Sequence, residues 1–416
     1  MAEIAGLTGL RPGSSGIAKI ITSPPYDVIK PGSGLEKLLQ ENENSFWHIT
    51  LGDKPKDALG RLVSRRALIR DDEPCFYVYS QEFDSWNGQR ITRLGFFAAP
   101  AVAQYETGDI IRHEQTFDDK VQGRLELAKQ LGMTIEPIFL LTKSRITDML
   151  REIADVVEPL YDFVSDFGAQ SELHGIHNRI YRIPASSSFG QALANLIRVN
   201  ALYIADGHHR YHSALLNNQA NTLAYIVEAD EIKKTRGIQA YNRAINGTVV
   251  FEDGINEISK ISGVCVEEQP ALIGVGCPNR GYFWVYTNGK VYWVDTAGMT
   301  RADDPVEGLD CKVLEQVVYP ALGLTESMLS DSGRFEYYPE QDNDKITALV
   351  DSGSFNAGIG LHAVSVDEVI AVADAGLKEM RENGNIAKPH FIMPKKSTFF
   401  APKILSGLFL YGHEYR

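Results

Sequence analysis

The stretch LYIADGHHRYHSAL, residues 202–215, carries the clearest structural signal in the chain. Its apolar start, LYIA, is typical of a buried strand, and Gly207 permits a tight turn into a helix that begins near His208. A helix that follows a strand in this way presents backbone N–H groups and the positive end of its dipole to an anion. The stretch therefore predicts a strand, a turn and a helix, with a phosphate-binding site at the turn.

Polar side chains at this turn suit the same chemistry. Arg210 carries a forked set of donors that fits phosphate oxygens, and His208 or His209 can donate or accept a proton. Two other interpretations stay open. Asp206 could cap the helix while the histidines satisfy local hydrogen bonds, or His208 and His212, four residues apart, could bind a metal ion near Asp206. The metal interpretation lacks the glutamate of the HExxH motif.

The segments around this stretch alternate between strand-like and helix-like patterns, which predicts the α/β (α+β) class. Residues 73–83 and 93–105 are rich in aromatic and branched side chains and are separated by an Asn-Gly signal, so they predict a β-hairpin. Residues 119–132 place apolar side chains at helical spacing, and the following TIEPIFLLT predicts a short apolar strand.

A second compositional region follows the first. Residues 281–296, GYFWVYTNGKVYWVDT, carry another hairpin signal, and residues 367–384, DEVIAVADAGLKEMRENG, have helical spacing. The tail returns to apolar and basic residues, as in the first region. We therefore expect one region formed by residues 1–248 and 390–416, and an accessory mixed α/β region at residues 249–389.

Composition limits the classes of partner. Of the 416 residues, 44% are hydrophobic, so the chain can bury a large core. It has 41 Lys and Arg against 54 Asp and Glu, and the resulting net charge of −13 argues against a nucleic-acid partner. There is no long apolar run and no signal-like start, so we expect a cytoplasmic protein without a membrane partner. Four cysteines without a CxxC pair argue against a disulfide scaffold and a thiolate zinc site.

A second polar cluster is IIRHEQTFDD, residues 110–119. Glu114 stands at a strand-to-helix junction beside His113, and a carboxylate there can act as general base towards a substrate hydroxyl. Asp118 follows just before the expected helix. A surface carboxylate or a helix-capping partner is the alternative interpretation of Glu114.

Two further motifs contain residues suited to ligand binding. In TSPPYDVI, residues 22–29, two prolines stiffen the backbone, so Tyr26 and Asp27 can be held at a ligand mouth; a rigid turn without a ligand is the alternative. The segment MPKKSTFFAPK, residues 393–403, supplies phosphate-type donors in a turn between prolines, and a solvated basic turn is the alternative. The chain has no GxxxxGK[ST] loop and no dinucleotide fingerprint.

Four motifs in order carry a family resemblance: SPPYDVI at 23–29, RHEQT at 112–116, ADGHHRYHSAL at 205–215 and MPKKSTFFAPKILSGL at 393–408. Together they resemble a bacterial and archaeal family named only as domain of unknown function ten-fifteen. The order of the HisGlu pair, a helix, a strand and AspGlyHisHisArg is also similar to that of free-serine kinases of the ParB and sulfiredoxin superfamily. This similarity implies a ParB/sulfiredoxin-like core with large insertions.

The same resemblance implies roles for residues. Glu114 would be the base on the serine hydroxyl, and Gly207 to Arg210 would form the phosphate turn. In GIQAYNRAI, residues 237–245, Arg243 is retained where relatives carry a ThrHisArg-like string, whereas Asn242 replaces the histidine.

The leading hypothesis is phosphoryl transfer to a small hydroxyl compound, with free L-serine as the first acceptor and ATP, ADP or pyrophosphate as donor, assisted by Mg²⁺. A phosphatase acting on a phosphomonoester and a nucleotide-responsive binding protein are the alternatives, and a homodimer is compatible with either. The residues assigned to this reaction are Glu114, His113 and His209 for catalysis; Asp206, Gly207, His208, His209, Arg210, Lys395, Lys396, Ser397 and Thr398 for phosphate; Tyr26, Asp27, Thr116 and Arg243 for substrate; and Asp206 and Asp118 for the metal.

Overall fold

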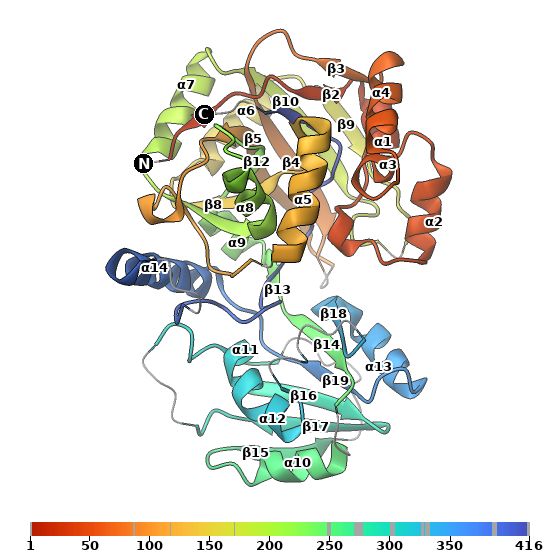
Figure 1. Ribbon diagram of the computed structural model, residues 1–416, viewed down its shortest axis with the longest axis vertical. Coiled ribbons are helices and arrows are strands. Elements are labelled where there is room, and N and C mark those ends of the chain that lie inside the picture. The colour runs from red at the N-terminus through yellow and green to blue at the C-terminus, as the bar shows by residue number, and fades with distance from the viewer. Residues whose placement is uncertain are drawn as a thin grey trace. The chain divides into compact units, whose positions relative to one another are not determined.

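The fold was analysed in a computed structural model (Figure 1), which describes residues 2–85, 88–116, 118–169, 171–247, 251–269, 278–299, 304–325, 328, 333–384 and 389–413. The chain forms two compact units, residues 1–237 with 402–416 and residues 238–401. Both combine helices with sheets, so the α/β class predicted from the sequence is confirmed. This division places residues 238–248 and 390–401, which the sequence analysis grouped with the first region, in the second unit.

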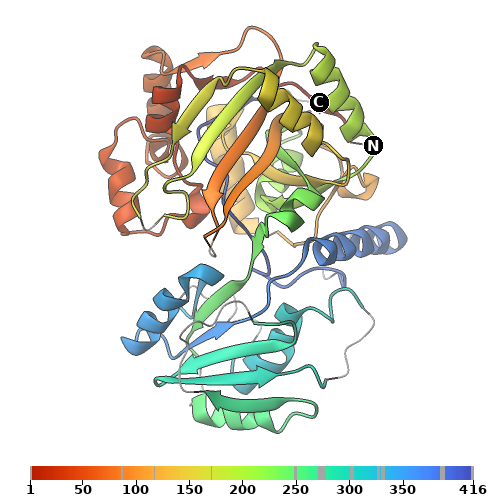
Figure 2. The same cartoon turned by 180° about the vertical axis from the view of Figure 1, so that it is seen from behind.

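A mixed sheet with the strand order β6-β11-β8-β12-β5-β4-β10-β9 forms the centre of the first unit, and β1 pairs with β5. Figure 2 shows the long antiparallel strands of this sheet from behind. The expected hairpin is present as β4 and β5, which pair Val78 with Phe96. The strands are β1 (Ile4–Ala5), β4 (Cys75–Asp84), β5 (Arg90–Pro100), β6 (Ile110–Ile111), β8 (Ile138–Thr142), β9 (Tyr161–Val164), β10 (His177–Pro184), β11 (Leu202–Asp206) and β12 (Ala224–Glu228). Short two-stranded ladders add β2 (Leu10–Pro12) with β3 (Leu68–Arg70) and β7 (Met133–Thr134) with β21 (Tyr411–Gly412).

Strand β8 lies in the middle of this sheet with every residue buried, as its apolar sequence predicts. It pairs parallel with β12 and antiparallel with β11. The β8–β11 register shifts between Ile204 and Asp206, so Ala205 forms a bulge one residue before the strand ends. A bulge re-aims the side chains that follow it, here Asp206 and the turn at Gly207.

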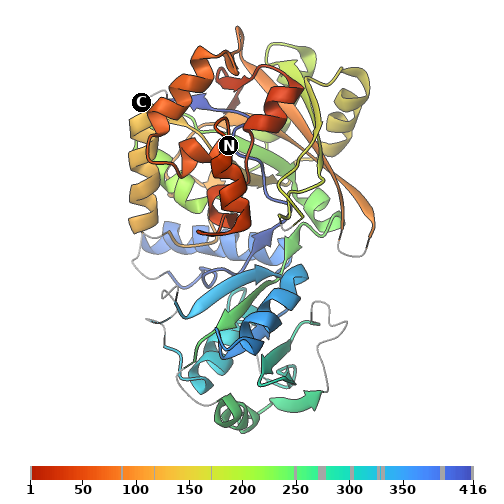
Figure 3. The same ribbon diagram turned by 90° about the vertical axis from the view of Figure 1, so that its right-hand side faces the viewer.

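Helices cover this sheet and its edges. The helix α5 (Asp118–Leu131) packs against α8 (His208–Leu216). The apolar spacing of residues 119–132 predicts the first, and the glycine turn after an apolar strand predicts the second. Figure 3 shows the first four helices gathered on one side of the unit. The remaining helices of the unit are α1 (Ser15–Ile21), α2 (Gly34–Glu41), α3 (Trp47–Thr50), α4 (Pro55–Ser64), α6 (Thr147–Val156), α7 (Ser188–Arg198) and α9 (Ala229–Lys234), with short 3-10 turns η1 (Tyr26–Val28) and η2 (Tyr105–Thr107).

The end of the chain returns to the first unit. Backbone hydrogen bonds join Ser406 to Ser23 and Leu410 to Leu10, and the buried Arg93 donates to the Pro402 carbonyl. These bonds bring Lys403, from the basic tail, into the same unit as Asp206.

The second unit contains a sheet of order β15-β17-β16-β19-β14-β18 and the short pair β13-β20. The expected hairpin is β16 paired with β17. The helix α14 begins with a capping box, in which Ser365 and Glu368 satisfy each other's backbone N–H groups. Its strands are β13 (Ile238–Gln239), β14 (Tyr241–Ile245), β15 (Cys265–Gln269), β16 (Tyr282–Thr287), β17 (Lys290–Asp295), β18 (Phe335–Pro339), β19 (Ala357–Gly360) and β20 (Phe399–Phe400); its helices are α10 (Phe251–Ser259), α11 (Asp310–Val313), the π-helical η3 (Leu314–Val318), α12 (Tyr319–Ala321), η5 (Glu340–Asp342), α13 (Asn343–Asp351) and α14 (Val366–Asn383). Throughout the described ranges, no helix has the length and apolar character needed to cross a membrane.

Candidate active site

Two of the sequence motifs meet because of one pairing in the large sheet. Strand β6 lies parallel to β11, with Ile110 opposite Leu202 and Ile111 opposite Tyr203. The carboxyl ends of parallel strands meet at one edge of a sheet, so the residues that follow these two strands lie together. RHEQT follows β6, and the AspGlyHisHisArg turn ends β11 and begins α8. The structure thus places residues 112–116 beside residues 206–210.

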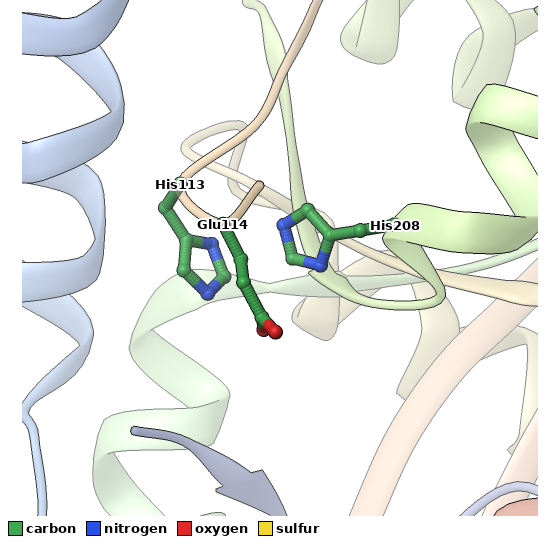
Figure 4. Close-up of side chains that lie close together, drawn as sticks. All are labelled: His113, Glu114 and His208. Atoms are coloured by element: carbon green, nitrogen blue, oxygen red, sulfur yellow. The ribbon is translucent and has the colours of Figure 1, made fainter. Parts of the chain in front are cut away.

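The centre of this edge is formed by His113, Glu114 and His208. Figure 4 shows the Glu114 carboxylate between the two imidazole rings. One ligand atom of each residue lies within 4.8 Å of the others. The rings meet edge to face, with centroids 4.5 Å apart at an interplanar angle of 88°. His113 is 1% exposed and His208 is 4% exposed, whereas Glu114 keeps partial exposure.

Burial fixes the charge of these imidazoles. It lowers the pKa of His113 to about 4, although the backbone of Ile204 and the carboxylate of Asp206 partly oppose the shift. The pKa of His208 lies well below its ordinary value, first because of burial and then because of His113. Both rings are therefore neutral at pH 7, and each then has one nitrogen lone pair able to accept a proton or a metal ion.

Most ring nitrogens of the two imidazoles lack a well-formed hydrogen bond to the described residues. Within the described ranges, the two ring nitrogens of His113 and Nε2 of His208 make no hydrogen bond of normal geometry. A buried polar atom without a partner costs about 1–3 kcal/mol, so a fold rarely retains several at one place without a further use for them. The unsatisfied nitrogens make this cluster a candidate binding site.

The turn into α8 has the shape expected from the sequence. Gly207 has a φ of +95°, and a Cβ there would come within 3.1 Å of Ile138 and Arg210 atoms, so only glycine fits. Gly207 is also the N-cap of α8 and has no side chain to cap the first N–H groups. The positive end of the helix therefore opens beside His208.

Asp206 and Arg210 are tied to each other. Arg210 Nη2 lies 3.0 Å from Asp206 Oδ2, and Lys403 Nζ lies 3.4 Å from the same oxygen. Arg210 Nη1 donates to the Pro137 carbonyl. Burial disfavours the charged form of Arg210, but Asp206 and then Glu136 outweigh it and raise the pKa. The Arg210 guanidinium thus already donates two N–H groups to acceptors inside the protein. Its assignment to phosphate stays a prediction.

The SPPYDVI motif lies next to this ion-pair group. The Tyr26 ring lies under the guanidinium of Arg124 at 3.9 Å, and the Tyr26 N–H donates to Glu136 at 3.4 Å. Burial, and then the charge of Asp27, raise the pKa of Tyr26 to about 12. A groove holding about 390 Å³ of space shared with solvent runs from Arg124 and Glu136 to Arg210. Tyr26 and Asp27 therefore surround the base of α8, where a small substrate could lie.

Three other predicted residues of the first unit are His209, Thr116 and Asp118. His209 is partly buried on the first turn of α8, and Thr116 is partly buried on the loop before α5. The side chain of Asp118 lies outside the described part of the structure. Their roles in catalysis, substrate binding and metal binding remain predictions.

The other predicted residues belong to the second unit. Arg243, on β14, is 2% exposed and lies over the rings of Tyr337 and Tyr319, 5.5 Å and 5.9 Å from their centroids. Its Nη2 donates to the Lys396 carbonyl at 3.3 Å, while its Nε has no partner among the described residues. A pocket of about 260 Å³ is lined by Arg243, Cys311, Glu315, Tyr319, Tyr337, Pro394 and Lys395.

The basic turn that contains Lys395 and Lys396 borders this pocket. Lys396 has a φ of +58°, and its ammonium lies 5.2 Å from the centre of the Tyr241 ring. Ser397 is buried and donates to the Pro394 carbonyl, and Thr398 is partly buried. Only Lys395 of the predicted phosphate residues lines the pocket with Arg243.

The metal predicted from the sequence can be tested against these donors. Mg²⁺ prefers oxygen ligands, but two of the three donors in the cluster are imidazole nitrogens, so the cluster does not fit Mg²⁺. Asp206 Oδ2 already pairs with two cations. The spacing of His208 and His212 had suggested another metal pair, but His212 stacks on the Tyr105 ring instead. Sequence reasoning missed the contact of His113 with His208, which the pairing of β6 with β11 creates.

The fold and this edge define a mixed α/β protein with a buried imidazole and carboxylate cluster beside a helix N-terminus. The chain belongs to the family described as Protein of unknown function (DUF1015), whose sequence profile matches residues 4–312. A comparison with curated proteins gives no match.

Solved structures with a similar arrangement include a conserved hypothetical protein from Pyrococcus furiosus, which is 13% identical with a TM-score of 0.35 and matches 76% of this chain and 95% of that chain. Free serine kinase in complex with AMP is also 13% identical, with a TM-score of 0.34 over 76% of this chain and 92% of that chain. A variant of free serine kinase in complex with ADP has a TM-score of 0.36, with 13% identity and the same coverage. Likeness at this level carries no argument about the reaction of this chain.

Proposed function

We propose that this protein is a phosphotransferase that moves a phosphoryl group from ATP, ADP or pyrophosphate to the hydroxyl of a small molecule, with free L-serine as the first acceptor to test. The observation that carries the proposal is the Glu114 carboxylate, held between two buried imidazoles beside the N-terminus of α8. Serine as acceptor and the ParB/sulfiredoxin-like core come from the order of motifs in the sequence.

In this proposal Glu114 accepts the proton of the acceptor hydroxyl, so that the hydroxyl oxygen can attack the terminal phosphorus of the donor. The bridging P–O bond breaks as the new ester bond forms, and ADP, AMP or phosphate leaves, according to the donor. Oxygens of the transferred phosphate face the first turn of α8, where backbone N–H groups and the helix dipole stabilise negative charge. His209, on the same turn, can donate a further hydrogen bond. Phosphoryl transfer depends mainly on positioning and charge stabilisation, which a rigid turn after a buried strand can supply.

The groove beside Tyr26, Asp27 and Arg124 suits an amino acid acceptor. Arg124 and Arg210 line it together with Glu136, so both a carboxylate and an ammonium can find an opposite charge there. The predicted Mg²⁺ ligands are Asp206, which already pairs with Arg210 and Lys403, and Asp118, whose side chain lies outside the described residues, so no step of the transfer is assigned to that ion. The assignment of Arg243 and of the turn at Lys395 to phosphate binding stays a prediction about the second unit taken by itself.

The direct test is product formation. The protein is incubated with each donor and with L-serine, L-threonine, glycerol or no acceptor, and new phosphate esters are sought by ³¹P NMR. We expect O-phosphoserine that depends on both donor and protein. Release of phosphate from O-phosphoserine without a donor would support the phosphatase alternative. Thermal stabilisation by ADP with no product from any acceptor would support the nucleotide-responsive binding protein.

A further inference from the structure

The two buried imidazoles of the cluster have no task in the proton transfer assigned to Glu114. His113 comes from the loop after β6 and His208 from the first residue of α8, so independent elements deliver them to one point. Their unsatisfied nitrogens lie within 4.8 Å of a carboxylate oxygen and of each other. Figure 4 shows that all three side chains converge.

We propose that His113, Glu114 and His208 bind a divalent first-row transition-metal ion such as Zn²⁺, Mn²⁺ or Fe²⁺. Imidazole nitrogens and one carboxylate oxygen are ligands that these ions share, and a set of two histidines and one carboxylate leaves further positions for water or substrate. A purely structural pair of histidines would be expected to make well-formed hydrogen bonds to the fold, whereas both nitrogens of His113 and Nε2 of His208 make none of normal geometry among the described residues.

The geometry requires only a small closure. Ligand atoms on one tetrahedral ion with bonds of about 2.1 Å lie roughly 3.4 Å apart. The atoms of the cluster lie within 4.8 Å of one another, so rotation of the partly exposed Glu114 side chain together with small rotations of the two imidazole rings would bring them to a common ion.

The charged groups around the cluster are of both signs, with Arg112 on the positive side and Asp206 on the negative. Asp206 acts on both imidazoles as a nearby negative charge and is held in place by Arg210 and Lys403. Outer carboxylates of this kind commonly tune metal ligands. Asp206 is thereby assigned to the surroundings of the ion and not to the ion itself.

This site goes beyond the proposed transfer and does not depend on it, because metal binding is measurable without turnover. A metal-bound Glu114 that uses one oxygen as ligand keeps the other for a substrate hydroxyl. Metal binding and phosphoryl transfer can therefore succeed or fail separately.

The test uses the full chain, stripped with a chelator and titrated with Co²⁺, whose visible absorption reports bound nitrogen ligands. Metal content after growth in medium with Zn²⁺, Mn²⁺ and Fe²⁺ is measured in parallel by mass spectrometry. We expect one equivalent of metal per chain, a Co²⁺ spectrum and a raised Tm on metal addition. The variants His113→Asn and His208→Asn should lose all three signals.

The matched control is His212→Asn, on the same helix but stacked on Tyr105, which should keep them. Circular dichroism of the stripped variants separates loss of binding from loss of fold. If a variant does not fold, the titration of the stripped wild type decides alone. Absence of a Co²⁺ spectrum in wild type, or an unchanged spectrum in both folded variants, would overturn the inference. Metal binding without phosphoester formation would refute the proposed function and leave the metal site standing.

Discussion

The His113–Glu114–His208 cluster of the first unit and the Arg243 pocket of the second bury side chains of opposite hydrogen-bonding character. The cluster buries neutral imidazoles, which offer lone pairs, beside a carboxylate. The pocket buries a guanidinium, which offers only N–H groups, between two tyrosine rings. Each keeps at least one buried nitrogen without a partner in the described structure. The cluster therefore suits a proton or a cation, and the pocket suits an anion.

This difference teaches that the basic residues identified in the sequence have different local partners. Within the first unit, Arg210 and Lys403 pair with Asp206; within the second, Arg243 and Lys395 line a pocket. A net charge of −13 coexists with both.

The largest effect is expected from Glu114→Gln. The amide cannot accept the hydroxyl proton, so kcat for phosphoester formation should fall by about 10²–10⁴-fold. Turnover is measured with saturating donor and acceptor. Glu126→Gln, on the exposed face of α5, is the control and should keep full activity. Wild-type rates in the Glu114→Gln variant would show that Glu114 is not the catalytic base.

The next effect is on stability. Arg210→Met removes one of the two ion pairs of Asp206, leaving the one with Lys403, and removes the bond to the Pro137 carbonyl, so the free energy of unfolding should drop by about 3 kcal/mol. Urea unfolding followed by circular dichroism measures the change. Arg198→Met breaks a solvent-exposed pair with Glu3 and should stay within about 0.5 kcal/mol of wild type. Equal losses in both variants would mean that the buried ion pair is not special.

Glu172 gives the first unit a pH dependence. Burial raises its pKa to about 7 from the ordinary 4.5, with Lys403 opposing the shift. The folded state therefore holds a proton that the unfolded state releases between pH 4.5 and 7, so this contribution is full below pH 4.5 and is lost as the pH rises to 7. Partial exposure of the side chain limits the loss to about 1–2 kcal/mol. Glu172→Gln should flatten this part of the pH profile of urea unfolding, while Glu158→Gln, at an exposed site, should not.

Arg243→Met separates binding from stability in the pocket of the second unit. The substitution removes a buried charge with few hydrogen bonds, which stabilises the fold, and it removes the contacts of the guanidinium with the rings, which destabilises it. The two effects offset each other, so the free energy of unfolding should change by less than about 1 kcal/mol. Pyrophosphate should raise the Tm of wild type and of Arg280→Met, a surface variant, but not that of Arg243→Met. A large loss of stability would mark Arg243 as a structural residue.

The smallest effect concerns Cys311 in the same pocket. Burial raises the pKa of this thiol to about 11 despite Arg243, so almost no thiolate is present at pH 7. A thiol reagent should label the exposed Cys265 within the folded chain, and Cys311 only after unfolding. Peptide mapping assigns the labelled sites, and Cys265→Ser provides the control. Rapid labelling of Cys311 would show that the charge of Arg243 prevails over burial.

Much of the fold was predictable from local pattern. Branched and aromatic residues on both sides of an Asn-Gly signal gave the β4–β5 hairpin, and helical spacing gave α5 and α14. The strand, the glycine turn and the helix at residues 202–216 follow the sequence closely, because Gly207 is required there by its positive φ. The boundaries drawn at residues 248 and 390 rest on composition, whereas the compact units divide at residues 237 and 402, because the division depends on which distant segments pack together.

The sequence by itself determined the elements that carry Glu114 and His208, the acidic surface charge and the family. Those features depend on residues within about one helix or strand of each other, where backbone preference and side-chain spacing act. Only the tertiary structure decided that His113 meets His208, that Asp206 is shared by Arg210 and Lys403, and that Arg243 packs against Tyr319 and Tyr337 within its own unit. The order in which strands pair is set by the packing of the whole sheet, and the parallel pairing of β6 with β11 joins residues nearly a hundred positions apart.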